Sequence, residues 1–228
     1  MDNDAHIANR FADRREAGRI LAQKLLEFRG RPDVIVLALP RGGVPVAFEV
    51  ATALEAPLDV FIVRKIGAPW NPELALGAIA SGGRYVLDAE VVRQLQLDES
   101  DIQRLIAPER QELERREQLY RDARPFPSLA GRIVIIIDDG LATGATMRAA
   151  IEAIRAEHPA HIIAAAPVAS SEACDMLRDV ADRTVCPYTP EPLYGVGLWY
   201  EDFSQTTDAE VLELLRRSAA RFSHVDAS

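Results

Sequence analysis

The 228-residue chain has little cysteine and little histidine: two cysteines, Cys174 and Cys186, and four histidines. None of these residues shows a spacing typical of metal ligands, and two cysteines are too few for a disulfide framework. The sequence therefore predicts neither a zinc site nor a disulfide-stabilised fold. We expect both cysteines to be thiols in a reducing compartment.

The chain also lacks long apolar runs and an excess of basic residues. No run approaches the roughly 20 apolar residues that a helix needs to cross a bilayer, and the start, M-D-N-D-A-H-I, lacks the apolar core of a signal peptide. We expect a cytoplasmic protein with no membrane partner. The 26 Lys and Arg residues against 35 Asp and Glu give a net charge of −9. Because nucleic acids are bound by basic surfaces, we expect no nucleic-acid partner.

The most informative stretch is Arg132 to Met147, R-I-V-I-I-I-D-D-G-L-A-T-G-A-T-M. Its β-branched run, Ile133 to Ile137, predicts a strand buried on both faces, as in a parallel sheet. A loop of small residues then leads into a helix, where glycines and the helix N-terminus favour phosphate. Carboxylates repel phosphate, so Asp138 and Asp139 should face sugar hydroxyls or a hydrated Mg²⁺. The alternative is a capped strand-to-helix turn of another doubly wound protein.

This stretch resembles the ribose 5-phosphate signature of the type I phosphoribosyltransferases. The resemblance implies that Asp138 and Asp139, here called the acidic pair, hold the 2′- and 3′-hydroxyls of phosphoribosyl pyrophosphate. It implies that residues 141–146 wrap the 5′-phosphate. The substrate-binding residues implied here are Asp138, Asp139, Gly140, Leu141, Ala142, Thr143, Gly144, Ala145 and Thr146. The early segment F-A-D-R-R-E-A-G-R-I-L-A resembles the opening of a group of uncharacterised bacterial phosphoribosyltransferases. This resemblance narrows the subfamily but does not indicate which substrate accepts the ribose 5-phosphate.

A second loop of this kind follows the first predicted strand, Asp33 to Leu39. The loop reads P-R-G-G, and a helix is expected from there through Leu54. In the family, the corresponding loop cradles pyrophosphate and often contains a cis peptide, so the resemblance implies this role for Arg41, Gly42 and Gly43. A plain turn that happens to carry arginine is the alternative.

The next predicted strand, Leu58 to Val63, ends in Arg64 and Lys65. In an open parallel sheet the carboxyl ends of all strands lie along one edge, where ligands bind. We therefore expect these cations to meet Arg41 and the acidic pair. Because alternate residues of a strand point to opposite faces, one of the two should contact ligand. The resemblance favours Lys65, at a position where the family often has a basic pyrophosphate contact.

Between this strand and the signature lie two segments of different character. Residues 66–88 are rich in glycine and proline and predict a mobile loop leading into a β-hairpin. The resemblance implies a lid over the reacting site, to which Trp70 or Glu73 could belong, although a structural loop accounts for both equally well. Residues 89–122 are densely charged and predict a helix that forms a solvated arm or a subunit contact.

Four aromatic residues lie within residues 194–203, here called the aromatic segment, Y-G-V-G-L-W-Y-E-D-F. They could form a stacking floor for a planar base. The resemblance to purine-type enzymes suggests Trp199 and Tyr200 for stacking and Asp202 for a polar contact. Packing into a hydrophobic cap is the alternative. A terminal helix is predicted from Thr207 to Phe222.

Residues 8–29 predict an amphipathic helix that ends near Gly30. Arg14 and Arg15 lie inside it. A solvated face is the favoured interpretation of these two arginines. The alternative is that one of them reaches the site or a subunit partner.

Taken together, the patterns predict an α/β fold with an open, mainly parallel twisted sheet flanked by helices, a small hood and a helical insertion. We expect one phosphoribosyltransferase-like domain over residues 1–228, with a core at about 30–188. The lid and helical arm would occupy about 66–124. The hood or C-terminal cap would occupy about 189–228, together with the helix at 8–29.

The resemblance implies a Mg²⁺-dependent glycosyltransferase of nucleotide metabolism that transfers ribose 5-phosphate from phosphoribosyl pyrophosphate to a nitrogen nucleophile, a nucleobase, and releases pyrophosphate. Catalytic roles fall to Asp139, Lys65 and Arg41, with Asp139 as a possible base and Asp138 and Asp139 as metal ligands. We expect a homodimer. One alternative is a non-catalytic sensor of phosphoribosyl pyrophosphate or a nucleotide. A dinucleotide-binding protein is disfavoured because no G-x-G-x-x-G follows a predicted strand.

Overall fold

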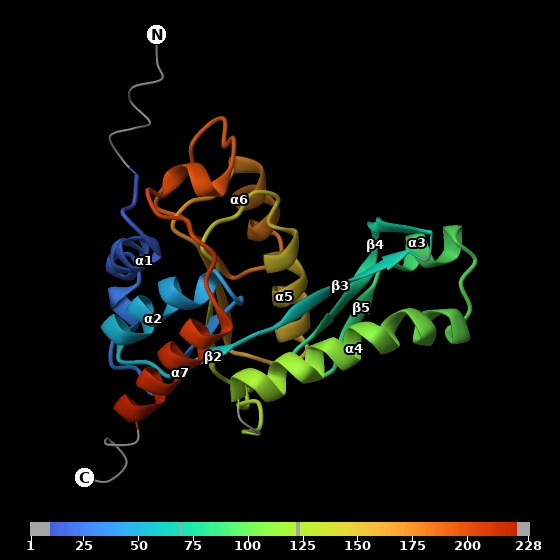
Figure 1. The fold of residues 1–228 in the computed structure, drawn as a ribbon, viewed down its shortest axis with the longest axis horizontal. Helices are drawn as coiled ribbons and strands as arrows, with labels where there is room; N and C mark the ends of the chain where they lie inside the picture. The colour runs from blue at the N-terminus through green and yellow to red at the C-terminus, as the bar shows by residue number, and fades with distance from the viewer. Residues whose placement is uncertain (1–9, 69, 122–123, 223–228) are drawn as a thin grey trace.

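The computed structural model describes residues 10–68, 70–121 and 124–222. Its centre is a five-stranded sheet in the order β2-β1-β6-β7-β8, and every neighbouring pair of strands is parallel. Figure 1 shows the fold of the chain. The strands are β1 (Val34–Ala38), β2 (Leu58–Val60), β6 (Ile133–Ile137), β7 (His161–Ala165) and β8 (Arg183–Val185). The expected α/β fold with an open parallel sheet is thus confirmed.

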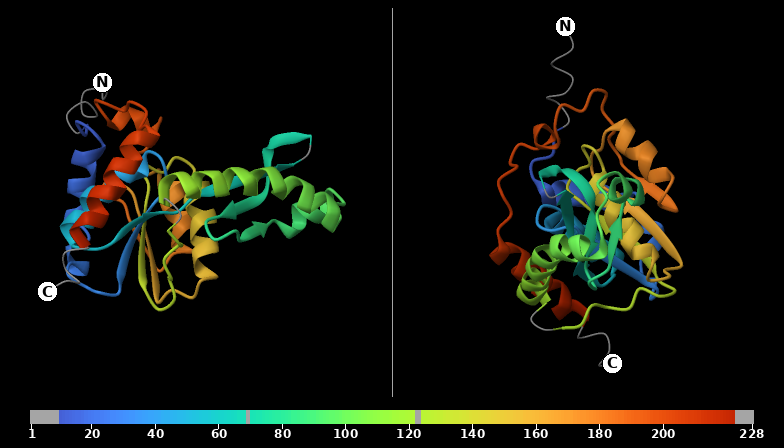
Figure 2. Two further views of the ribbon diagram at one scale, coloured as in Figure 1. Left: turned by 60° about the horizontal axis from the view of Figure 1, so that its bottom comes forward. Right: turned by 90° about the vertical axis from the view of Figure 1, so that its right-hand side faces the viewer.

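The two central strands, β1 and β6, are buried along their whole length, as their unbroken apolar runs predict. Alternate residues of each strand enter different hydrophobic cores on the two faces of the sheet. One face is covered by α1 (Arg14–Gln23), α2 (Gly43–Leu54) and α7 (Asp208–Phe222), and the other by α5 (Ala145–Arg155) and α6 (Ser171–Arg178) (Figure 2).

The N-terminal helix is shorter than the predicted 8–29. It begins after Asp13, whose carboxylate accepts a 2.8 Å hydrogen bond from the Glu16 N–H and caps the helix. It ends at Gln23 and is followed by a 3₁₀ turn, η2 (Leu26–Phe28). Helix α1 packs tightly on α2 at Gly18, because a Cβ there would lie 2.6 Å from the carbonyl oxygen of Val46. This contact fixes where the first turn of α1 lies.

Residues 63–68 and 70–121 form an arm that extends sideways from the sheet (Figures 1 and 2). The arm contains a separate antiparallel sheet and two helices: β3 (Val63–Ala68), β4 (Asn71–Ala80), β5 (Tyr85–Leu87), α3 (Ala89–Gln94) and α4 (Glu99–Arg121). Three predictions are corrected here. The expected strand Leu58 to Val63 ends at Val60. The expected mobile loop instead belongs to β3 and β4, whereas the β-hairpin that was expected after it is confirmed as β4 and β5. The charged helix is interrupted at Gln96, whose φ is 53°.

Arg121, at the end of α4, joins the arm to the central sheet. Its side chain is almost fully buried and donates to Asp59 at 3.1 Å, to the carbonyl of Val60 at 2.5 Å and to Glu117 at 2.7 Å. The guanidinium also lies 4.7 Å from the centre of the Phe126 ring. A buried arginine with this many partners fixes the base of the arm. Among the described helices, none has the length and apolar character needed to span a bilayer.

The Arg121→Met variant should lower the free energy of unfolding by about 2–4 kcal/mol, because it removes the side-chain donor of the Val60 carbonyl and the cationic partner of Asp59 and Glu117. Urea denaturation followed by circular dichroism measures this change. Arg115→Met is the matched control, since Arg115 forms an exposed pair with Glu112 on the same helix and should change stability by less than about 0.5 kcal/mol. Equal stability of the two variants would contradict the assigned role of Arg121.

Candidate functional site

The loops after β1 and β6 meet at the carboxyl edge of the sheet. The two strands are neighbours, with Ala38 paired to Ile137. A Cβ on Gly43 would lie 2.7 Å from the carbonyl oxygen of Ile137, and a Cβ on Gly42 would collide with the Asp139 carboxylate. Only glycine therefore permits this approach. Residues 40–43, here called the glycine loop, lie directly against the acidic pair, and their Pro40–Arg41 peptide is cis.

The acidic pair is asymmetric. The backbone N–H of Asp139 donates to Oδ1 of Asp138 at 2.9 Å. Burial, and then the charge of Asp139, raises the pKa of Asp138 to about 8, although part of the residue reaches the surface. Asp139 instead has a cationic partner, because its Oδ2 accepts a 2.8 Å hydrogen bond from Nε of Arg14. The pair thus combines one carboxyl group that favours the neutral form with one that is ion-paired.

Arg14 is a site residue that sequence reasoning placed on a solvated helix face. Its side chain is 11% exposed, and its guanidinium lies between Asp139 and the Phe203 ring, 4.0 Å from the ring centre. Of the two interpretations given for the N-terminal arginines, the alternative is therefore correct for Arg14, which reaches the site. Only the resemblance of the surrounding segment marked this region, because nothing in its helical pattern separates Arg14 from Arg15.

Residues 138–146, here called the signature loop, are supported by the segment that precedes α6. The Leu141 N–H donates to the Val168 carbonyl at 3.0 Å, and the Ser170 hydroxyl donates to the Ala142 carbonyl at 2.7 Å. Gly144 adopts a left-handed φ of 71° just before α5. The residues on the outer side of the loop are exposed, namely Ala142, Thr143, Ala145 and Thr146. This surface at a helix N-terminus suits an anionic group.

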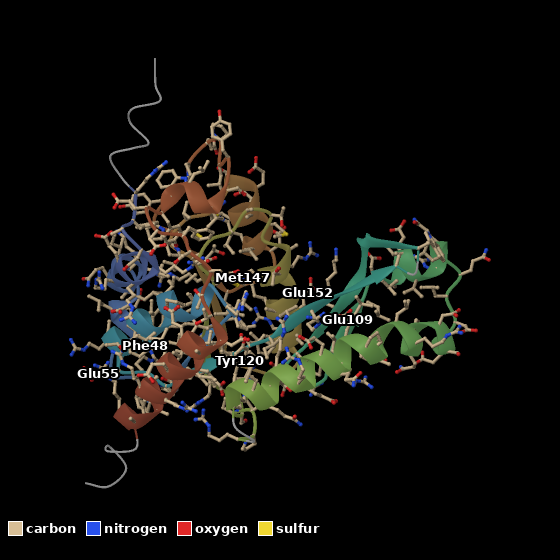
Figure 3. The ribbon with its side chains drawn as sticks, viewed as in Figure 1. Phe48, Glu55, Glu109, Tyr120, Met147 and Glu152 are labelled. Carbon is tan, nitrogen blue, oxygen red and sulfur yellow. The ribbon has the colours of Figure 1, made fainter. Side chains whose placement is uncertain are left out.

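Arg41 lies on the same edge but is engaged by an acidic residue. Its Nη1 is 3.7 Å from Oδ1 of Asp208, the first residue of α7. The Tyr120 hydroxyl, from α4 of the arm, donates to the same oxygen at 2.5 Å. Figure 3 shows Tyr120 where α4 lies next to α7. Burial, and then this bond, raises the pKa of Tyr120 to about 12. The roles of Asp208 and Tyr120 here were not anticipated from the sequence, since both residues belong to segments far from Arg41 along the chain.

Lys65 and Arg64 lie in β3 of the arm rather than at the end of a central strand. They face opposite ways, as alternation predicts. Arg64 pairs with Glu109 of α4 at 2.6 Å. Lys65 lines a groove of about 580 Å³ between the arm strands and α5, together with Ala145 and Thr146 of the signature loop. The arm therefore brings Lys65, and not Arg64, to the signature loop.

The aromatic segment divides between buried and exposed positions. Tyr200 is 3% exposed and packs between Phe11 and Phe203, with ring centres 5.2 and 5.0 Å away. Its hydroxyl donates to the Asp139 carbonyl at 2.5 Å, and burial raises its pKa well above the usual range. Because both neighbours are already rings, this position favours a packing role over base stacking.

The remaining candidates of this region are more accessible. Trp199 ends a 3₁₀ turn, η3 (Val196–Trp199), and lies 6.1 Å from the Tyr188 ring centre. Asp202 accepts from the Ser204 N–H at 2.9 Å, and this bond lowers its pKa. The turn also touches the signature loop, because a Cβ on Gly140 would collide with Val196. Trp70 is 67% exposed next to the start of β4, while the Glu73 side chain lies outside the described residues.

A metal held by protein groups alone has little support in this site. Across the described ranges, no three His, Cys, Asp or Glu side chains gather closely enough to form a cation cage. The acidic pair offers two carboxyl groups, which matches the number Mg²⁺ uses when phosphate oxygens supply the other ligands, and binding of the ion would release the proton of Asp138. The donor set thus fits an ion that binds together with a phosphorylated substrate.

An open parallel sheet with a glycine loop and an acidic signature loop at adjacent strand ends defines the type I phosphoribosyltransferase fold. The family model for the phosphoribosyl transferase domain matches residues 11–190. The chain belongs to this family.

Relatives with high similarity support the assignment. Proteins of Mycobacterium tuberculosis strains CDC 1551 and H37Rv, each named "putative phosphoribosyl transferase", are 45% identical over 217 residues. That match covers 95% of this chain and 49% of the relatives, so the chain spans about half their length. The crystal structure of TT1426 from Thermus thermophilus is 44% identical, with a TM-score of 0.82 over 91% of this chain and 98% of that one.

The asymmetry of the acidic pair predicts opposite effects of two amide substitutions on stability. The folded-state pKa of Asp138, about 8, lies above its ordinary value of 3.8. Its contribution to stability is therefore full below about pH 3.8 and is lost as the pH rises to about 8. Asp138→Asn keeps the acceptor for the Asp139 N–H without the charge. It should raise the free energy of unfolding by at least about 1 kcal/mol at pH 7.5, and by less at pH 5.

Asp139→Asn is the comparison variant, because it removes the charged partner of Arg14 and should lower the free energy of unfolding by about 1–3 kcal/mol. Thermal and urea unfolding of both variants at pH 5 and 7.5 measure the difference. A destabilised Asp138→Asn at pH 7.5, or a gain that does not depend on pH, would show that the Asp138 carboxyl group is not destabilised by burial.

Proposed function

We propose that the chain transfers ribose 5-phosphate from phosphoribosyl pyrophosphate to a nitrogen nucleophile, a nucleobase, and releases pyrophosphate. The observation that carries this proposal is the packing of the glycine loop on the acidic pair, which places Arg41, Asp138 and Asp139 on one rim. The signature loop begins on the same rim. A cation, two carboxyl groups and a loop that suits phosphate together match one class of ligand, a phosphorylated sugar that carries a second phosphate group.

Each part of the donor would have its own partner. The exposed backbone of residues 142–146, at the N-terminus of α5, would bind the 5′-phosphate. The acidic pair would accept hydrogen bonds from the ribose hydroxyls. Arg41 and Lys65 would stabilise the departing pyrophosphate, whose negative charge grows as the C1–O bond loosens in an oxocarbenium-like transition state. Arg41 would then exchange its carboxylate partner, Asp208, for substrate.

Magnesium belongs to the proposal as an ion that arrives with the donor. Asp138 and Asp139 would hold it together with substrate oxygens. When bound, it would supply positive charge that lowers the cost of placing pyrophosphate beside two carboxylates. The protein residues would still orient the sugar and shield it from water.

The acceptor would lie near the aromatic segment. Trp199 is partly buried on η3, and η3 contacts the signature loop through Val196 and Gly140. A planar base beside Trp199 would therefore lie close to the ribose. Tyr200 would not contact the base; its hydroxyl group would hold the Asp139 carbonyl in place. A homodimer is also part of the proposal, since the projecting arm offers surface to a second copy (Figure 1).

A pyrophosphate-release assay with phosphoribosyl pyrophosphate, Mg²⁺ and a panel of purine and pyrimidine bases tests the proposal. We expect release with at least one base, and at least about a hundredfold slower release for the Asp138→Asn, Asp139→Asn double variant, because two transition-state contacts are lost. Arg115→Met is the control with an intact site. Release that is equal in the double variant, or that needs no base, would contradict the assignment.

A sensor of phosphoribosyl pyrophosphate is the second candidate, and one observation favours it. Two charged residues of the site already have partners within the protein. Asp139 forms an ion pair with Arg14, and Arg41 forms one with Asp208. Such a site could bind the donor, with Arg41 exchanging Asp208 for substrate, without turnover. Donor binding without pyrophosphate release for any base would support the sensor.

Titration calorimetry tests the role of Mg²⁺ separately from the rest of the proposal. Phosphoribosyl pyrophosphate should bind at least about tenfold more tightly with Mg²⁺ than with a chelator present, because the donor must approach two carboxylates. Ribose 5-phosphate is the control ligand and should respond less, since it lacks the pyrophosphate. Identical donor isotherms in the two conditions would remove Mg²⁺ from the proposal.

A further inference from the structure

Arg14 lies where three segments of the site meet. Its Nε donates to Oδ2 of Asp139 at 2.8 Å, and its Nη1 donates to the carbonyl of Ser204 at 2.7 Å. Its guanidinium also covers the Phe203 ring at 4.0 Å. A single side chain therefore joins the acidic pair to the C-terminal end of the aromatic segment.

The glycine loop touches the same junction. A Cβ on Gly42 would collide with the Asp139 carboxylate and would lie 3.3 Å from Nε of Arg14. The bond between Arg14 and Asp139 is thus covered by the backbone of the loop that carries Arg41. Any movement of the guanidinium would change the position of the Asp139 carboxylate and the packing of that loop.

The backbone just before Arg14 is bonded to the aromatic segment. The Phe11 N–H donates to the Trp199 carbonyl, and the Glu201 N–H donates to the Phe11 carbonyl, both at 2.8 Å. The Asp202 N–H donates to the carbonyl of Ala12 at 3.0 Å. The start of α1 is therefore in register with the aromatic segment, and Arg14 has little freedom to leave its partners.

The geometry points to a role for these contacts, and we propose that Arg14 is a positioning residue. It would hold Asp139 in the orientation that binds ribose and hold the aromatic segment over the acceptor side of the site. This proposal rests on the proposed function. Arginine suits the role because its planar fork donates in two directions while its face covers a ring, whereas a lysine ammonium is a point charge.

Calorimetric titration of phosphoribosyl pyrophosphate with Mg²⁺ into Arg14→Gln, Arg14→Lys and Arg15→Gln tests the proposal. Arg15 is the matched control, because it is the next residue of α1 and contacts neither Asp139 nor Ser204 within the described parts of the chain. We expect the dissociation constant to rise at least about tenfold for Arg14→Gln and by an intermediate factor for Arg14→Lys. It should change by less than about twofold for Arg15→Gln.

The binding stoichiometry separates positioning from mere stability. If Arg14 only supported folding, its loss would lower the fraction of competent protein and leave the dissociation constant unchanged. We expect a full stoichiometry and a weaker constant. A dissociation constant equal to that of Arg15→Gln, or a reduced stoichiometry at unchanged affinity, would overturn the positioning role. Should Arg14→Gln not fold, the comparison of Arg14→Lys with Arg15→Gln decides in the same way.

Tryptophan emission gives a readout that needs no ligand. In a Trp70→Phe background Trp199 is the remaining tryptophan, and Arg14→Gln should shift its emission to longer wavelength while Arg15→Gln should not. Unshifted emission would overturn the link to the aromatic segment. Absence of donor binding by the unaltered chain would overturn the proposed function and this proposal together. Donor binding that is insensitive to Arg14 would overturn this proposal alone.

Discussion

The close approach of two backbones is the constraint on which the site depends. Gly42 and Gly43 lie against Asp138 and Asp139 with no room for a side chain between them. This approach requires β1 and β6 to be neighbours in register, and their uniformly buried residues secure that pairing. A buried parallel core thus determines how near a cationic loop and an acidic loop come to each other.

The charges of the site are balanced within the protein. Asp139 pairs with Arg14, Arg41 lies near Asp208, and the pKa of Asp138 is raised so that its neutral form is favoured. A chain with a net charge of −9 thereby presents a rim with little excess negative charge. For an anionic donor, under the proposed function, Arg41 exchanges Asp208 for substrate, while Arg14 remains paired with Asp139.

Local patterns predicted the parts of the fold that local chemistry determines. The runs Val34–Ala38 and Ile133–Ile137 are β-branched or apolar throughout, so their burial in a parallel sheet could be read directly. The family resemblance then singled out the loops that follow them. The prediction of a single strand ending in Arg64 and Lys65 was wrong. Apolar residues continue past Val60, although the chain leaves the central sheet there and enters the sheet of the arm. Periodicity carries no signal for such a change.

Contacts between distant segments could not be predicted. Arg14 and Asp139 are 125 residues apart, and Tyr120 and Asp208 are 88 apart. An arginine on an amphipathic helix resembles every other solvated arginine until its tertiary partner is known. Tyr200 illustrates the same limit, since an aromatic near a ligand site can stack on the ligand or pack behind the loop that binds it. Here the burial of the Tyr200 ring between Phe11 and Phe203 favours packing.

The affinity of a Gly42→Ala variant for phosphoribosyl pyrophosphate with Mg²⁺ tests the central claim most directly. The added methyl group would collide with the Asp139 carboxylate, so the two loops must separate at a cost of about 1–3 kcal/mol. The control is Gly195→Ala, where a Cβ meets nothing within 4 Å. If the loops act as one unit, Gly42→Ala binds the donor at least about tenfold more weakly than Gly195→Ala while remaining folded. Equal affinity of the two variants would show that contact between these loops does not build the site.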